Sequence, residues 1–590
     1  MSERPPHADA LRRALDAPTV ADAFDLTADA VADHPALRGP DGQHYTWGAY
    51  RSAARRCAAG LARLGLRPGD TLGLLLGNRP EFHIVDAAAM TIGVTTCSLY
   101  PTAPQEELRH QADDSRMSVL VCDAAGREQA QDLLRDCPGL RETVTVGGPH
   151  GLGALLDAPG SHPYRHRVRP DDILTVVYTS GTTGAPKGAE LTHGAVRATG
   201  RAFLERVPLP AGSRLVSYLP MAHIAERCCS HYLPMVLGAD VTCCPEADRL
   251  FSVLPRVRPH WLFSVPRMWE KLRTRLLAEL ATAPEDFRRG ALRALELGEA
   301  LAHGEDAAHG EDAAVRAEYA RLEAGHLAPV RTLLGLDEAR FVHVGAAPVA
   351  PATMAFLRAL GLPAGEIWGM TELCAAACVT VSGRHRMGWI GPPLPGVELR
   401  TADDGEVLVR GATTMRGYRG RPRETAEVLD AEGWVHTGDL GEVADDGALR
   451  ITGRKKDLIV NAYGKNMSPA RIEERIGHGE PLIDQVFVIG DGRPYNTALI
   501  TLVALGSGSG SGSSDTDTDT DRIRRAVAHG NRHLSRPERV RRFAVVENTW
   551  TPHSGLVTPT LKMRRRAIGR HYRDLIDTLY AGGGLTPLED

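Results

Sequence analysis

The chain has 590 residues, of which 43% are hydrophobic and 24% are charged, and its formal net charge at pH 7 is −4. This length holds a large core and more than one domain, and the near-neutral charge argues against a protein built mainly to bind nucleic acid. The opening MSERPPHADALRR lacks the apolar run of a signal peptide, and no later segment approaches the ~20 apolar residues of a spanning helix. The ten cysteines contain no CxxC pair, so we expect reduced, mostly buried thiols and a cytoplasmic protein.

Short apolar strands alternate with helical segments over roughly the first 370 residues. Strands are expected at 173–178, 215–219, 261–265 and 340–344. Pro266 suits the first position of the helix that follows the third of these strands, and Gly361 is a helix stop. Strand, loop and helix in repeated order predict an α/β domain with a parallel sheet and functional loops at the strand ends.

Near residue 395 the pattern changes to short strands separated by Gly and Asp, as in GEVLVRG and GALRITGR, which predicts a β-rich subdomain. After GRKKD (453–457) a further α+β segment runs to the end of the chain. We therefore expect a large N-terminal α/β domain over 1–452, a connecting segment at 453–457 and a small α+β C-terminal domain over 458–590.

Two low-complexity tracts interrupt this organisation. Residues 302–314 contain the unit AHGEDAA twice, with Ala308 shared by the two copies. The unit has too few apolar residues for a coiled-coil seam, so an exposed helix or an expanded loop is expected. Residues 506–521, GSGSGSGSSDTDTDTD, bury too little apolar area to offset their ordering entropy and predict a flexible insertion.

The stretch VVYTSGTTGAPKG (176–188) follows a predicted buried strand with hydroxyls, glycines and a lysine. Glycines let backbone N–H groups approach phosphate oxygens, hydroxyls add donors, and lysine adds positive charge, although a surface turn has a similar composition. The P-loop of NTPases is excluded because it requires Gly, four residues, then Gly-Lys-Ser/Thr. Here Gly181 and Gly184 are three residues apart and Lys187 precedes Gly188.

Further motifs decide between a phosphate loop and a turn. YTSGTTGAPKGAELTH resembles the phosphate loop of the acyl-adenylate-forming (AMP-binding) superfamily, which includes acyl-CoA synthetases, adenylation domains and luciferases. The segments WGMTE (368–372), 417–443, 453–473 and TPTLKMRRR (558–566) match later motifs of the superfamily in the same order. The resemblance runs from about residue 30 to the C-terminus.

Four segments narrow the resemblance within this superfamily. LPMAHIAER (219–227), FSVPRMWEKL (263–272), GWIGPPLPGVE (388–398) and TPTLK look like those of bacterial long-chain fatty-acid–CoA ligases. The resemblance implies attack of a carboxylate on the α-phosphorus of ATP, then transfer of the acyl group to coenzyme A. Two alternatives remain: transfer to a carrier-protein phosphopantetheine, and a nucleotide- or lipid-binding regulator that has lost turnover.

The resemblance also implies roles for individual residues around the phosphates. The β- and γ-phosphates would be held by Thr179, Ser180, Gly181, Thr182, Thr183, Gly184 and Lys187. Thr371 would contact phosphate and Glu372 would bind Mg²⁺, a hard cation that prefers carboxylate oxygen. Outside the WGMTE motif, such a pair would be an ordinary helix start.

The nucleoside is the second group with implied contacts. The adenine would lie against Trp368 and against Gly345, Ala346 and Ala347, although a plain tight turn before Pro348 has the same local pattern. Gly369 and Met370 would also contact the nucleotide. Trp368 stands where the superfamily usually has tyrosine, so an aromatic face is kept and the tyrosine hydroxyl is absent. Asp439 would accept both ribose hydroxyls, and Arg454 would reach the ribose or a phosphate.

Three more residues complete the implied machinery. His223 matches the histidine beside the acyl carboxylate, although a lone histidine is more often structural. Lys562 matches the catalytic lysine of adenylation, with a basic patch as the alternative because arginines are frequent in 522–542. Lys456 occupies the hinge position of a mobile C-terminal domain.

The resulting expectation is a long-chain fatty-acid–CoA ligase that uses ATP, Mg²⁺ and coenzyme A, with fatty acid as substrate and no nucleic acid partner. A cytoplasmic location leaves open a peripheral contact with the inner face of the membrane, where lipid substrate would be collected. Acyl chain length, oligomeric state and the acceptor of the acyl group are not fixed by any motif.

Overall fold

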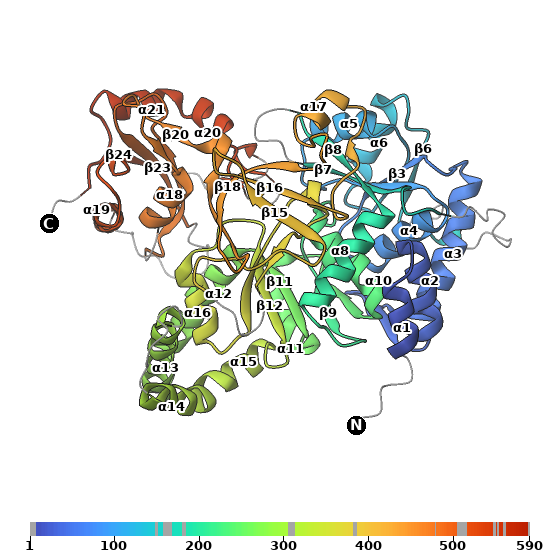
Figure 1. The fold of residues 1–590 in the computed structure, drawn as a ribbon, viewed down its shortest axis with the longest axis horizontal. Helices are drawn as coiled ribbons and strands as arrows, with labels where there is room; N and C mark the ends of the chain where they lie inside the picture. The colour runs from blue at the N-terminus through green and yellow to red at the C-terminus, as the bar shows by residue number, and fades with distance from the viewer. Residues whose placement is uncertain are drawn as a thin grey trace.

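The computed structural model has a large N-terminal domain and a separate C-terminal domain, drawn in orange and red at the upper left of Figure 1. It describes residues 8–147, 152–156, 168–179, 185–304, 313–380, 386–477, 480–503, 516–546, 550–551, 554–558 and 562–587. Within these ranges, no helix combines the length and the apolar character needed to cross a membrane.

A seven-stranded sheet forms the first half of the N-terminal domain. In spatial order it contains β17 (Gly417–Tyr418), β8 (Lys187–Thr192), β7 (Ile173–Thr179), β4 (Thr95–Ser98), β3 (Thr71–Leu75), β5 (Met117–Cys122) and β6 (Glu142–Thr145). The strands from β7 to β6 are parallel, whereas β8 and β17 are antiparallel additions at one edge. β3 and β4 are buried along their whole length, as expected for parallel strands covered on both faces.

Helices lie before and between these strands in the sequence. They are α1 (Ala8–Leu15), α2 (Val20–Ala30), α3 (Trp47–Arg63), α4 (Pro80–Thr91), α5 (Gln105–Asp114), α6 (Arg127–Asp136), α7 (Leu152–Leu156) and α8 (His193–Arg206). The hydroxyls of Thr19, Thr46 and Thr192 cap the N-termini of α2, α3 and α8 by accepting backbone N–H groups.

Two four-stranded sheets complete the α/β part. One has the order β2 (His44–Thr46), β1 (Pro35–Arg38), β10 (Asp240–Cys243), β9 (Arg214–Ser217); the other has β11 (Trp261–Ser264), β12 (Phe341–Gly345), β13 (Ala364–Trp368), β14 (Cys378–Val379). The connecting segments are α9 (Ile224–Arg227), the π-helix η1 (Cys228–Tyr232), α10 (Leu233–Leu237), η2 (Ala247–Arg249), α11 (Leu250–Val257), α12 (Pro266–Ala281), α13 (Glu285–Gly304), α14 (Ala313–Leu322), the π-helix η3 (Glu323–Leu327), α15 (Ala328–Leu334), α16 (Pro351–Ala359) and η4 (Thr371–Leu373).

The predicted strands and helix limits of this region are confirmed. β7, β9, β11 and β12 lie where strands were expected, α12 starts at Pro266, and Gly361 follows α16 with a φ of 77°. The expected β-rich subdomain is the antiparallel sheet β15 (Val397–Thr401), β16 (Glu406–Gly411), β18 (Val435–Val443), β19 (Leu449–Arg454), with α17 (Pro422–Ala426) beside it.

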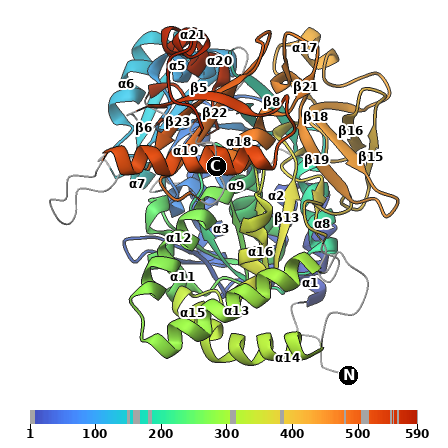
Figure 2. The same ribbon diagram turned by 90° about the vertical axis from the view of Figure 1, so that its left-hand side faces the viewer.

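The C-terminal domain has its own sheets and its own apolar core. It contains η5 (Lys455–Asp457), β20 (Ile459–Val460), β21 (Asn466–Met467), α18 (Pro469–Gly477), β22 (Ile483–Ile489), β23 (Asn496–Leu502), α19 (Thr516–Arg532), β24 (Val540–Val546), α20 (Arg565–His571) and α21 (Arg573–Tyr580). Figure 2 shows α19 lying across the face of this domain next to α18. Ile472, Ile523 and Phe543 are fully buried in one cluster that includes no residue before Ile459.

The two low-complexity tracts are described only at their ends. Residues 305–312 and 504–515 lie outside the described residues. Residues 516–521, which the composition placed in a flexible insertion, instead form the first turns of α19. Asp519 and Asp521 lie 4.0 and 3.4 Å from Arg522 and Arg524 at i,i+3 spacing, and acidic side chains near a helix N-terminus are favourable.

Candidate active site

The predicted phosphate loop connects two antiparallel neighbours, β7 and β8. Thr179 and Lys187 pair directly across the two strands, and the Thr179 hydroxyl donates to the Lys187 carbonyl at 3.5 Å. The five residues between them, Ser180, Gly181, Thr182, Thr183 and Gly184, lie outside the described residues. The ends of the loop are therefore fixed at the edge of the seven-stranded sheet.

Tyr418 contacts both Lys187 and Glu372. Tyr418 was not predicted from the sequence as a site residue. The Lys187 Nζ lies 5.2 Å from the centre of the Tyr418 ring, and the Tyr418 hydroxyl donates to Glu372 Oε1 at 2.5 Å. Glu372 is 5% exposed and follows Thr371, the first residue of η4. Tyr418 reaches this point because β17 pairs with β8. Its place in GYRGRP, within a matched motif, was the only signal available.

The ends of β12 and β13 lie side by side and require small residues. Gly345 pairs with Ile367, and a Cβ at Gly345 would meet the Ile367 carbonyl oxygen at 2.3 Å. A Cβ at Gly369 would meet the Ala375 carbonyl oxygen at 2.0 Å. Ala346 has a φ of 64°, a left-handed conformation that is strained for a non-glycine residue. This tight turn continues through Ala347, which is exposed.

A buried carboxylate joins the third sheet to the β-rich subdomain. The Trp368 Nε1 donates to Asp439 Oδ2 at 2.9 Å, and Arg454 Nε lies 2.7 Å from Asp439 Oδ1. Asp439 and Arg454 are register partners on β18 and β19. Burial raises the pKa of Asp439, and the attraction of Arg454 offsets only part of this effect. Asp439 Oδ1 is buried and makes no hydrogen bond apart from its ion pair with Arg454, so it can still accept an incoming hydroxyl.

His223 caps α9 through its side chain. Its Nδ1 accepts the N–H of Ala225 at 3.2 Å, which leaves the ring proton on Nε2. Burial, with a smaller contribution from the charge of Lys562, lowers the pKa of His223 to about 3. The imidazole is therefore neutral at physiological pH and acts as a hydrogen-bond donor through Nε2.

Lys562 reaches this site from the C-terminal domain. The Thr558 N–H donates to the Lys562 carbonyl at 2.8 Å, and the Lys562 N–H donates to the Thr558 hydroxyl at 3.0 Å. The residue keeps contact with solvent, yet the surrounding protein desolvates its ammonium group, and Arg454 repels it. Together these effects lower the pKa of Lys562 to about 8, against the opposing attraction of Asp439 and Glu372.

The arrangement concentrates cationic and donor groups around two buried carboxylates. Lys187, Arg454 and Lys562 supply positive charge, and His223 supplies a neutral donor, which suits a substrate rich in phosphate oxygens. The open acceptor on Asp439 fits a ribose hydroxyl. Glu372 offers a hard oxygen ligand that fits Mg²⁺, because Tyr418 occupies only one of its two carboxylate oxygens.

Among the described residues, contacts join Lys187 to Glu372 through Tyr418, and Trp368 to Arg454 through Asp439. Lys456 differs because it lies in η5, exposed, between the two domains. Its neighbour Lys455 is held to the N-terminal domain, with Nζ 2.5 Å from Asp404 Oδ2 and 3.1 Å from Glu406 Oε2. Two of the arginines behind the alternative interpretation, a basic patch, have partners: Arg522 pairs with Glu480 at 2.7 Å, and Arg542 donates to the Gly583 carbonyl at 3.0 Å.

Comparison with known families matches both parts of the chain. A family model described as AMP-binding enzyme matches residues 24–419, and a second, described as AMP-binding enzyme C-terminal domain, matches residues 456–583. The chain therefore belongs to the AMP-binding enzyme family, the class that its fold and its interdomain site define.

Particular relatives refine this assignment. A putative fatty-acid–CoA ligase of Mycobacterium tuberculosis is 40% identical over 425 residues, which cover 70% of this chain and 74% of that protein. A long-chain-fatty-acid–CoA ligase of Mycobacterium bovis is 32% identical over 553 residues, which cover 89% of this chain and 90% of that protein.

Solved structures share the fold at lower sequence identity. The adenylation domain of a carboxylate reductase from Mycobacterium chelonae aligns with a TM-score of 0.78 at 20% identity, covering 98% of this chain and 95% of that one. A fatty acyl CoA synthetase of Mycobacterium tuberculosis aligns with a TM-score of 0.64 at 22% identity, covering 95% of this chain and 99% of that one.

Proposed function

We propose that this protein is a long-chain fatty-acid–CoA ligase in which the residues described above have the roles that follow. The chain is an AMP-forming acid–thiol ligase: it converts a fatty acid and ATP into acyl-AMP and pyrophosphate, then transfers the acyl group to coenzyme A and releases AMP. The observation that carries the site assignment is the position of Lys562, which the C-terminal domain brings within electrostatic range of Glu372, Asp439 and Arg454.

In the first step a carboxylate oxygen of the acid attacks the α-phosphorus of ATP, and the bond from that phosphorus to pyrophosphate breaks. Negative charge grows on the phosphate oxygens, so preorganised cations and donors lower the barrier. We assign stabilisation of the α-phosphate and the acyl carboxylate to Lys562, and a hydrogen bond to the same carboxylate to the neutral His223. The β- and γ-phosphates are assigned to Thr371 and the loop Thr179, Ser180, Gly181, Thr182, Thr183, Gly184 and Lys187.

The nucleoside is assigned to the surfaces around β12, β13 and β18. Adenine packs against Trp368 and the turn of Gly345, Ala346 and Ala347, with Gly369 and Met370 closing the side. Asp439 accepts the ribose hydroxyls, for which its open oxygen supports the assignment. Glu372 holds Mg²⁺, which supplies charge neutralisation of the triphosphate when bound.

In the second step the thiol of coenzyme A attacks the acyl carbon and AMP leaves with the electron pair of the broken C–O bond. We propose that the C-terminal domain rotates about Lys456 between the steps. The ion pair between Lys455 and Asp404 supports a hinge at Lys456, because it holds the residue just before Lys456 to the N-terminal domain.

The preference for long acyl chains rests on the relatives named as long-chain ligases, one of which matches 89% of this chain. The same names favour coenzyme A over a carrier-protein thiol as the acceptor. Neither inference depends on the residues that hold the nucleotide.

The test is pyrophosphate release with acetate, octanoate, palmitate and benzoate, each with and without coenzyme A, followed by mass spectrometry of the products. We expect the highest kcat/KM with palmitate, acyl-AMP without coenzyme A, and acyl-CoA with it. A maximum for acetate, octanoate or benzoate overturns the long-chain proposal, and acyl-AMP that never transfers to coenzyme A favours the carrier-protein acceptor.

A further inference from the structure

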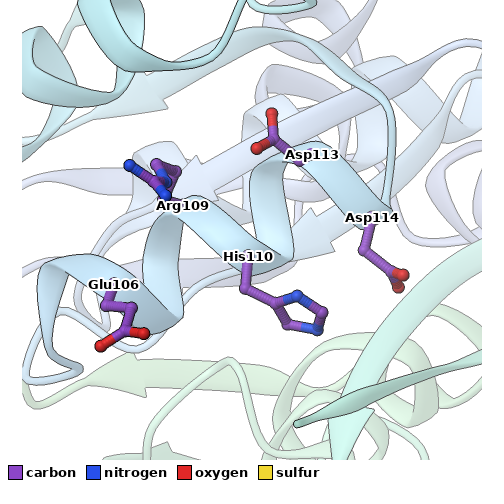
Figure 3. Close-up of a pocket in the computed structure, with 5 residues that line it drawn as sticks. All are labelled: Glu106, Arg109, His110, Asp113 and Asp114. Atoms are coloured by element: carbon purple, nitrogen blue, oxygen red, sulfur yellow. The ribbon is translucent and has the colours of Figure 1, made fainter.

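Helix α5 contains no residue that the motifs assign, yet one of its faces contacts several parts of the site. Glu107, His110, Gln111 and Asp114 lie at i, i+3, i+4 and i+7 and therefore share this face. Figure 3 shows His110 and Asp114 projecting from the same side of the helix, where they line a surface pocket.

Two of these side chains are tied to the ends of the phosphate loop. The His110 Nε2 donates to the Pro186 carbonyl at 2.9 Å, one residue before Lys187. The Asp114 carboxylate accepts the Tyr178 hydroxyl at 2.8 Å, one residue before Thr179. Because both contacts come from one rigid helix, the two ends of the loop move with α5.

Glu107, one turn earlier on α5, contacts the C-terminal domain. Arg564 Nη2 donates to Glu107 Oε2 at 3.0 Å, and the Gln111 amide donates to Glu107 Oε1 at 3.2 Å. The side chains of Arg564 and Glu107 are 26% and 12% exposed, so water screens this ion pair less than a surface pair.

Arg564 lies two residues beyond Lys562 and is joined rigidly to it. The Arg564 N–H donates to the Leu556 carbonyl at 2.8 Å, and Val557 pairs with Met563. With the two bonds between Thr558 and Lys562, these contacts tie the backbone of residues 556–558 to that of residues 562–564. The Lys562 backbone is therefore held in register with that of Arg564.

We propose that Glu107 is a positioning residue for acyl-AMP formation: through Arg564 it aligns Lys562 with Tyr178 and Pro186, the residues flanking the phosphate loop that α5 also contacts. The ion pair spans the two domains, so it is lost when the C-terminal domain rotates away, and its contribution is confined to the first half-reaction. This inference rests on the proposed role of Lys562.

The experiment measures the two half-reactions separately: acyl-AMP formation in a single turnover, and thioester formation from supplied acyl-AMP and coenzyme A. The variants are Glu107→Gln, Arg564→Gln and the double variant. The matched control is Glu106→Gln, the same chemical change at the exposed neighbouring residue on α5. Thermal melting of each variant checks folding.

We expect Glu107→Gln and Arg564→Gln each to slow acyl-AMP formation about tenfold, as for a charge-assisted bond that aligns a reacting group. The double variant should be no slower than either single one, because both remove the same interaction. Thioester formation should stay within about twofold, and Glu106→Gln should behave as wild type. The exchanged pair Glu107→Arg with Arg564→Glu should recover part of the lost rate.

Equal losses in both half-reactions, additive losses in the double variant, or an effect of Glu106→Gln as large as that of Glu107→Gln would each overturn the proposal. If Glu107→Gln fails to fold, the proposal can still be tested, because Arg564→Gln is expected to lose the same activity. A wild-type enzyme that releases no pyrophosphate with any acid instead overturns the proposed function, which separates the two failures.

Discussion

Trp368 stands where the superfamily usually has tyrosine, and its indole N–H makes a hydrogen bond in the structure. Its N–H donates to Asp439 Oδ2, so the ring that faces the proposed adenine site also orients the carboxylate proposed to bind ribose. Burial raises the pKa of Asp439, and the bond from Trp368 is one of the contacts that opposes this increase. One side chain thus serves two parts of the nucleotide site.

Trp368→Phe tests this coupling. The aromatic face remains, but Asp439 loses a donor and its buried oxygen is left unpaired, so we expect KM for ATP to rise about tenfold. KM for the fatty acid should change little. Steady-state kinetics with each substrate varied in turn is the measurement, and an unchanged KM for ATP would contradict a positioning role for the indole N–H.

The second prediction concerns the hydrogen bond that the neutral imidazole of His223 is proposed to donate. His223→Gln keeps an N–H donor near the position of Nε2, whereas His223→Ala removes it. We expect acyl-AMP formation to fall by on the order of 10²-fold in His223→Ala and by clearly less in His223→Gln. Because the pKa of about 3 lies far below neutrality, neither the wild type nor His223→Gln should show a rate change around pH 6.5 that depends on this residue.

Lys562 is expected to act in its protonated form. Since its pKa is lowered to about 8, the charged fraction falls as pH rises through 8, and kcat/KM for acyl-AMP formation should fall with it. Lys562→Ala should lose on the order of 10²-fold or more in this half-reaction and lack the alkaline decline. Thioester formation from supplied acyl-AMP should largely survive. An alkaline decline of the same size in Lys562→Ala would assign the titration to another group.

At the scale of elements, a buried polar network fixes the helical segment that starts at His223. Arg227 on α9 forms an ion pair with Asp86 on α4, and both side chains are 0% exposed. The π-helix η1 then brings His231 Nε2 to 2.7 Å from Asp86 and the Tyr232 hydroxyl to 2.6 Å from Arg227. Burial alone would raise the pKa of Asp86, but Arg227 and His231 lower it overall.

Asp86→Asn is expected to destabilise the protein strongly, because it leaves the Arg227 charge buried without its partner. Breaking a buried pair by removing one member costs about 3–5 kcal/mol. Asp577→Asn is the matched control, since it breaks an exposed pair with Arg493 (2.8 Å) and should cost less than about 1 kcal/mol. Denaturant unfolding measures both, and similar values for the two variants would contradict the buried-network account.

At the scale of the whole molecule, ion pairs between the domains hold the arrangement that places Lys562 at the site. Arg564 pairs with Glu107, and Arg267 at the start of α12 pairs with Asp484 on β22. The chain between them is short: Lys455 is anchored to the N-terminal domain, and Ile459 already belongs to the core of the C-terminal domain. Any rotation must therefore be absorbed by a few dihedrals around Lys456.

Lys456→Pro tests this hinge. Proline fixes φ near −65° and removes an N–H, so it restricts the backbone change that rotation needs. We expect acyl-AMP formation near the wild-type rate and loss of thioester formation from supplied acyl-AMP. Separate assays of the two half-reactions on folded protein decide the matter. A loss shared equally by both steps would show that this hinge does not serve domain alternation here.

Much of this molecule could be predicted from local sequence. The strands β7 and β12 follow from short apolar runs, and Pro266 and Gly361 mark helix limits through their own backbone preferences. The candidate site residues were proposed because they lie in short motifs whose order along the chain is specific, and their roles stay predictions. The prediction that the flexible tract extends to residue 521 was wrong, because α19 begins at Thr516. An acidic, threonine-rich run has no apolar periodicity from which the start of this helix could be predicted.

The contacts between distant segments were decided only by the tertiary structure. Tyr418 meets Glu372 because β17 joins the edge of the seven-stranded sheet, and Glu107 meets Arg564 across 457 residues of chain. Motif spacing carries no information on such pairs, since each partner is an ordinary polar residue in its own segment. The lowered pKa values of His223 and Lys562 likewise arise from desolvation and from charges on other elements, which exist only once the chain is folded.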